Sequence, residues 1–139
     1  MPTDDPYELA YQIDRLMRRM NAGITARAPR FDPDRIGPIG GMILLTIADL
    51  EPVTMQRVAD MMARDKAQLS RTISVLERHG LIERSAHGSD KRSSLLSLTS
   101  SGAKFVETIK HSLTDVLDDV LAPLSEPERR QLLALLEKL

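Results

Sequence analysis

The sequence predicts a mainly helical (α+β) fold, in which helices precede and follow one short β-hairpin. Three observations predict it. Apolar residues recur at intervals of three and four over most of the chain, as on one face of a helix. Helix-capping residues stand before several of these runs. Two short apolar runs between residues 81 and 98 flank a turn-forming stretch, as in a hairpin. With 139 residues, the chain is expected to form a single domain, 1–139.

The first helix is expected over 5–27. Asp5 is placed as its N-cap, and Glu8 stands three residues later, where it would complete a capping box. A stretch rich in Pro, Asp and Gly then predicts a loop over 28–38. An almost wholly apolar run predicts a second, buried helix over 39–50.

Two further helices follow in close succession. Thr54 can cap a short third helix, and a tight turn leads to Asp65, the N-cap of a fourth helix that is expected to run to His79. Gly80 supplies the stop that helices commonly need at their C-terminal end. Helical spacing assigns three apolar residues to the inner face of the fourth helix: Leu69, Ile73 and Leu76.

The hairpin and two last helices complete the chain. Leu81–Ile82 and Leu95–Leu98 flank the turn His87–Asp90, which predicts two antiparallel strands. A long helix is expected over 99–122, and a capping box that begins at Ser125 opens the last one. The leucines of that last helix are too many to face water in a lone domain.

The composition excludes several classes of function. The chain has no cysteine, so disulfides, thiolate metal sites and cysteine redox switches are excluded. It has no Gly-rich phosphate loop, nucleophile elbow or His-rich metal spacing, so we expect neither an enzyme nor a cofactor or metal site. No apolar run approaches the ~20 residues of a membrane span, and the first residues are acidic. A cytoplasmic protein with no membrane partner is expected.

The positive charge is concentrated in one part of the chain. The net charge of the whole chain is only −1, but residues 57–92 hold eight Lys and Arg against five Asp and Glu. The segments before and after are both acidic. A local excess of positive charge is the electrostatic mark of a surface that binds nucleic acid.

The order of short helix, tight turn, polar basic helix and basic hairpin predicts a winged helix-turn-helix over 39–98. In such a unit the second helix enters the DNA major groove, and the hairpin reaches phosphates or the minor groove. Arg71 is the first candidate for a base contact, since Arg pairs with guanine through two hydrogen bonds. The candidate DNA-binding residues from this reasoning are Gln56, Arg57, Lys66, Gln68, Ser70, Arg71, Thr72, Arg84, Lys91 and Arg92.

Two alternatives stay open. Gln68 stands three residues after Asp65 and has about equal odds of closing a capping box there without touching DNA. Basic residues on an exposed helix face are usually only solvated, and a winged helix can also be a protein-interaction module without specific DNA binding. Truncation of Arg71 or Arg92 and a salt series separate these interpretations.

The stretch from Val53 to Gly102 resembles the MarR family of bacterial transcriptional regulators. Three segments carry the resemblance: Leu76–Arg84, Asp90–Arg92 and Leu98–Gly102. The resemblance implies a regulator, by default a repressor, in which Arg92 enters the minor groove and Asp90 braces the wing. Ala67-Gln68 and Arg64 depart from residues that the family often shows, so base preference cannot be transferred.

The helices that flank the winged unit, 5–27 and 99–139, are expected to join two copies into a homodimer on a palindromic operator, with half-sites roughly 34–36 Å apart. The alternative is that their apolar stripes are intramolecular core, above all between Phe105 and Val120. The resemblance also implies a small amphipathic effector. An anionic one is suggested by Arg15, Arg18 and Arg19, although basic residues on a helix face are more often only solvated. The residues expected at the dimer interface are Leu9, Ile13, Leu16, Leu132, Leu133 and Leu136.

Overall fold

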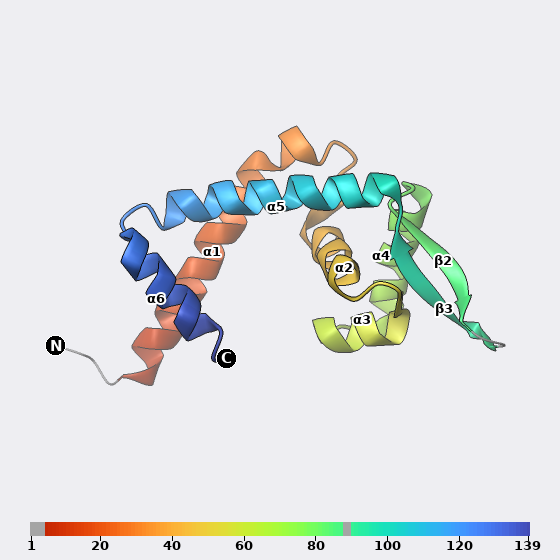
Figure 1. Cartoon of the computed structure of the whole chain (residues 1–139), viewed down its shortest axis with the longest axis horizontal. Helices are drawn as coiled ribbons and strands as arrows, with labels where there is room; N and C mark the ends of the chain where they lie inside the picture. The colour runs from red at the N-terminus through yellow and green to blue at the C-terminus, as the bar shows by residue number, and fades with distance from the viewer. Residues whose placement is uncertain (1–4, 88–89) are drawn as a thin grey trace. The chain divides into compact units, whose positions relative to one another are not determined.

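A computed structural model describes residues 5–87 and 90–139, with the side chains of 87 and 90–93 left out (Figure 1). The chain divides into two compact units, which we describe separately. The winged unit is Ala28–Lys110, and the helical unit is Met1–Arg27 with His111–Leu139. Two long helices belong to both: α1 (Pro6–Phe31) and α5 (Ser100–Val120). No helix in the described ranges is long and apolar enough to cross a membrane.

The winged unit packs three helices against a small sheet. Its helices are α2 (Gly37–Leu50), α3 (Met55–Met62) and α4 (Lys66–Arg78). Its strands β1 (Val53–Thr54), β2 (Ile82–His87) and β3 (Asp90–Leu98) form an antiparallel sheet in the order β1-β3-β2. The predicted mainly helical fold with a hairpin is therefore confirmed. The side chains of its core that are fully buried are Ile43, Leu44, Ile47, Val58, Leu69, Ile73, Leu76 and Leu96.

Three of the predicted helix caps are confirmed. The Thr54 side chain accepts a hydrogen bond from the Arg57 amide, and the Asp65 side chain accepts one from the Ala67 amide. Ser125 and Glu128 form the predicted reciprocal capping box at the start of α6 (Glu126–Leu136). Each cap satisfies an amide that the helix itself leaves without a partner.

The start of α1 differs from the prediction in one respect. Asp5 caps the helix, since its carboxylate accepts from the Tyr7 amide at 3.0 Å. The predicted capping box is wrong, because the Glu8 carboxylate instead accepts from the Gln12 side chain at 2.7 Å, one turn further along.

The loop predicted over 28–38 is also wrong in extent. Helix α1 continues to Phe31 with Pro29 inside its last turn, and α2 begins at Gly37. Pro29 removes one hydrogen bond from α1, but the helix continues past it, and the Asp32 amide donates to the Ala28 carbonyl at 2.8 Å. The buried carboxylate of Asp32 then accepts from the amides of Ile36 at 2.7 Å and Gly37 at 2.8 Å, which ties the short remaining loop to the start of α2.

The helical unit has its own small core. Val116, Val120 and Leu121 of the α5 end are buried in it. Gly23 of α1 lies so close to α5 that a Cβ at this position would be 2.6 Å from a Val116 methyl carbon. The partly buried side chains packed against this core are Leu16, Met20, Ile24, Leu124 and Leu132.

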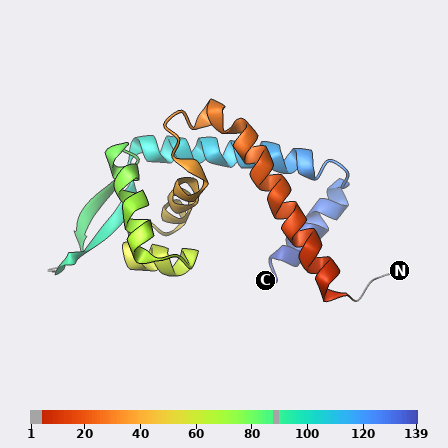
Figure 2. The same cartoon turned by 180° about the vertical axis from the view of Figure 1, so that it is seen from behind.

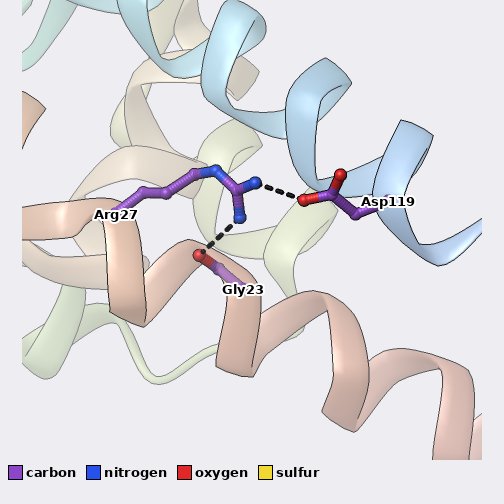
Figure 3. Close-up of polar contacts among 3 residues, drawn as sticks. All are labelled: Gly23, Arg27 and Asp119. Atoms are coloured by element: carbon purple, nitrogen blue, oxygen red, sulfur yellow. Dashed lines mark hydrogen bonds and ion pairs between the residues drawn. The ribbon is translucent and has the colours of Figure 1, made fainter.

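Two ion pairs bracket this core. Arg27 of α1 donates to the Asp119 carboxylate of α5 and also to the Gly23 carbonyl (Figure 3). Arg129 of α6 donates to the Asp118 carboxylate at 2.9 Å and to the Leu121 carbonyl at 3.1 Å. Each arginine therefore joins two helices of the unit: Arg27 joins α1 to α5, and Arg129 joins α6 to α5.

Candidate nucleic-acid interface

The turn between α3 and α4 sets the two helices at an angle. Ala63 ends α3 in the left-handed conformation, with φ 49°. The Arg64 amide then donates to the Ala59 carbonyl at 3.2 Å, and Asp65 opens α4 in an extended conformation. Left-handed Ala63 and extended Asp65, with Arg64 between them, redirect the chain from α3 to α4 within three residues. Helix, tight turn and helix therefore succeed one another as in a helix-turn-helix.

One face of α4 is exposed among the residues of the winged unit that the structure describes. Leu69, Ile73 and Leu76 bury the opposite face against α2 and α3. At 100° per residue, the positions farthest from these three form a single stripe. The stripe consists of exposed residues: Ala67, Arg71, Ser74 and Arg78. Arg71 thus lies at the centre of the exposed face, as expected of a residue that reads bases.

The other candidates on α4 divide into two groups. Lys66 and Gln68 are exposed. The Gln68 side chain makes no capping bond to Asp65 in the described part of the chain. Ser70 and Thr72 are half-buried, and the Thr72 hydroxyl donates to the Gln68 carbonyl at 3.3 Å. Arg71, Lys66 and Gln68 are therefore the α4 candidates whose side chains are best placed to reach DNA.

The candidates on α3 stand at its first turn. Arg57 is exposed, and its backbone amide donates to the Thr54 hydroxyl at the cap, while its guanidinium has no partner among the described residues. The Gln56 side chain donates to the Asp60 carboxylate at 2.9 Å. The Arg57 guanidinium is available to a phosphate, whereas the Gln56 side chain would have to break its hydrogen bond to Asp60 before it could contact DNA.

The hairpin lies beside α4 in the winged unit (Figure 2). Arg84 on β2 does not extend freely, because its Nε donates to the Glu77 carboxylate of α4 at 2.7 Å. Asp90, Lys91 and Arg92 belong to β3, and the structure does not describe their side chains. The middle of the predicted turn, residues 88–89, lies outside the described residues. The roles of Asp90, Lys91 and Arg92 at the wing tip stay predictions.

Sequence reasoning missed two residues of the exposed stripe, Ser74 and Arg78. Both follow Arg71 at intervals that return to the same helix face, so the periodicity that identified the core contained the signal. Arg64 in the turn is also exposed, although the sequence marks it only as a departure from a family pattern. All three enlarge the polar and basic surface around Arg71.

The predicted dimer residues fall into two sets in the helical unit. Leu9, Ile13, Leu133 and Leu136 are about half or more exposed, from 49% to 66%. Leu16 and Leu132 pack instead against the small core of the same unit. An intramolecular role therefore accounts for Leu16 and Leu132 but leaves the other four side chains uncovered.

No three His, Asp or Glu side chains converge on a common point in residues 5–87 and 90–139 as a metal site would require. A shallow groove of about 260 Å³ lies in the helical unit between α1 and α5. Two guanidinium groups, one carboxylate and apolar side chains line it: Arg19, Ala22, Gly23, Arg27, Val116, Asp119 and Val120.

Comparisons with known proteins agree with this geometry. Residues 41–94 match the sequence model of the MarR family. The HTH-type transcriptional regulator BilQ of Clostridium symbiosum is 39% identical over 87 residues, which cover 62% of this chain and 60% of that protein. The match thus spans about three-fifths of the length of this relative.

Solved structures resemble the fold over nearly the whole chain. The S. aureus MepR–DNA complex has 26% identity and a TM-score of 0.73, covering 93% of each chain. A mutant of E. coli MarR complexed with operator DNA has 23% identity and a TM-score of 0.76, covering 94% of this chain and 92% of that one. The segment that matches the family model includes α3, α4 and most of the hairpin, the elements that form the exposed basic surface described above. The chain is thus similar to the MarR family over residues 41–94, and its fold resembles that of solved MarR structures.

Proposed function

We propose that this protein is a sequence-specific DNA-binding transcriptional regulator, with α4 in the major groove and the hairpin against the adjacent backbone. The observation that carries the proposal is the α4 face centred on Arg71, which is exposed in the described part of the winged unit. Solved relatives with this fold include chains bound to DNA. The proposal assigns Arg71 to bases and Lys66 and Arg57 to phosphates.

Binding to DNA from upstream of the protein's own coding sequence, measured by fluorescence anisotropy across a salt series, tests this function. Each phosphate contact releases counterions, so the affinity should fall steeply and log-linearly as salt rises. Unrelated DNA of equal length is the control, and it should bind more weakly at every salt concentration. Equal, weak binding to both DNAs would favour the protein-interaction module instead.

The proposal includes a homodimer held by the uncovered leucines of the helical unit. Leu133 and Leu136 are 58% and 53% exposed, and exposed apolar side chains that adjoin one another commonly mark a protein–protein interface. A two-fold pair of copies would bury them and present two α4 helices to a palindrome. A palindromic operator matches this two-fold arrangement, and repression is proposed only from the resemblance to the MarR family.

Leu136→Glu should convert the dimer to monomer, because the interface would have to bury an unpaired carboxylate. The operator affinity should fall with it, since each half-site would then bind independently. Sedimentation velocity at several concentrations measures the change. Gln131→Glu adds the same charge at an exposed polar position of α6 and should leave the dimer intact. A monomeric parent protein would refute the interface.

A small amphipathic anion is proposed as the effector that releases DNA. The groove between α1 and α5 supports this chemistry, since an apolar floor lies beside the guanidinium group of Arg19, whereas Arg27 is paired with the Asp119 carboxylate that also lines the groove. An effector releases DNA only if it binds better to a state that does not fit the operator. Adding benzoate as a probe to the anisotropy titration should therefore weaken operator binding, and no change would argue against release by an aromatic carboxylate.

A further inference from the structure

Arg84 lies on the inner face of the hairpin. Side chains alternate between the two faces of a strand, so Arg84 shares its face with Ile82, which is buried. Its partner across the ladder is Leu96 of β3, which is fully buried. Directly opposed residues of an antiparallel pair point to the same face. Arg84 therefore belongs to the face that packs toward α4.

The partner of Arg84 on α4 is Glu77. The Arg84 Nε lies 2.7 Å from the Glu77 Oε1, and the two side chains are 33% and 32% exposed. Glu77 stands in the last turn of α4, between its buried face and the exposed stripe. The pair thus connects α4 to β2, the strand that leads to the wing tip. It lies near Gly80, where the chain passes from the C-terminal end of α4 to the start of β2.

We infer that the Glu77–Arg84 pair positions the wing: it locks the base of the hairpin onto α4 and so sets where the basic wing tip falls relative to Arg71. Arg84 is in this account a positioning residue, not a phosphate contact. The inference rests on the proposed DNA-binding function and names a determinant of the same site. It replaces the direct DNA role that the sequence alone suggests for Arg84.

The direction in which one substitution changes the operator affinity separates positioning from direct contact. Glu77→Gln removes a negative charge close to the DNA-binding surface, which by electrostatics alone should strengthen binding. If the pair positions the wing, the same change should weaken operator binding by about three- to five-fold, the upper part of the range measured for solvent-accessible ion pairs. The salt slope should stay that of the parent protein, because no phosphate contact sits at Glu77 itself.

Glu83→Gln is the matched control. Glu83 is next to Arg84 on β2 but on the opposite face, exposed and without an ion pair in the described part of the chain. Glu83→Gln removes the same negative charge at a position close to the pair, and operator binding should be unchanged or slightly stronger. Arg84→Gln should weaken binding at least as much as Glu77→Gln, because it also removes a positive charge, and the double variant should be no worse than Arg84→Gln alone.

The exchange Glu77→Arg with Arg84→Glu completes the test. Positioning predicts that the exchanged pair restores the operator affinity to within about two-fold of the parent, because the ion pair reforms with its polarity reversed. Direct contact predicts a further loss, since a carboxylate would then face phosphate. Thermal melts of all variants show whether they are folded.

Two outcomes would overturn the inference. One is tighter or unchanged binding by Glu77→Gln together with weaker binding and a shallower salt slope for Arg84→Gln, which would make Arg84 a phosphate contact. The other is a failed exchange in a folded protein. A parent protein that shows no preference for its upstream DNA would instead refute the proposed function, and the inference with it, before any variant is compared.

Discussion

Arg71→Ala is expected to weaken operator binding by about 30-fold or more while the dimer persists. A well-formed pair between Arg and guanine contributes about 1–3 kcal/mol of discrimination, and a dimer on a palindrome holds two of them. Arg71 stands at the centre of the exposed α4 stripe, with no ion pair in the described ranges to hold it elsewhere. Anisotropy titration of the operator and of unrelated DNA measures both affinity and preference.

The loss should be greater for the operator than for unrelated DNA, because a base contact is lost along with one charge. Arg18→Ala is the control, since it removes an exposed arginine from the helical unit and should change neither affinity by more than about two-fold. An equal loss on both DNAs would make Arg71 a phosphate contact, and parent-like affinity would exclude α4 as the reader.

Gly102→Ala is expected to destabilise the fold by about 3 kcal/mol or more. A Cβ on Gly102 would lie 1.9 Å from the Leu81 carbonyl oxygen, and this neighbour is backbone that cannot rotate away. The same carbonyl accepts from the Thr99 amide at 3.1 Å, and the Thr99 hydroxyl accepts from the Gly102 amide at 3.0 Å. Overpacking in a well-packed core commonly costs about 1–3 kcal/mol, and here several hydrogen bonds would also be strained.

Urea unfolding followed by circular dichroism measures this effect as a fall in the transition midpoint. Ser101→Ala is the neighbouring control, exposed on the same turn of α5, and should change stability by no more than about 0.5 kcal/mol. If Gly102→Ala unfolds at the parent midpoint, the close approach of α5 to the start of the hairpin does not exist in solution.

The helix starts could be predicted from the sequence because they rest on local chemistry. Thr54, Asp65 and Ser125 each cap the helix that follows, and such caps involve residues two or three positions apart. The stretch 28–38 was mispredicted because its Pro, Asp and Gly residues are individually loop formers. Pro29 nevertheless fits within the last turn of α1, where only one hydrogen bond is lost.

The short strand β1 escaped prediction for a different reason. Val53 and Thr54 form it only by pairing with Leu96 and Leu95 of β3, far along the chain. Two residues carry no periodic signal, so a strand this short exists through its tertiary partner and not through its own propensity.

The candidate site was predictable where helical periodicity applies and less so where it depends on contacts between elements. The exposed position of Arg71 follows from the spacing of the buried Leu69, Ile73 and Leu76. Ser74 and Arg78 follow from the same spacing. The pairing of Arg84 with Glu77 requires the hairpin to lie against α4, which the sequence does not encode locally. Lys91 and Arg92 stay predictions.

Footprinting of the DNA upstream of the coding sequence, with the parent protein, tests the central claim most directly. The account predicts a protected inverted repeat with half-sites about one helical turn, roughly 34–36 Å, apart, and loss of that protection in Arg71→Ala. Protection with no sequence preference by a folded, dimeric protein would contradict it, because a reader helix that docks on any DNA equally carries no sequence recognition.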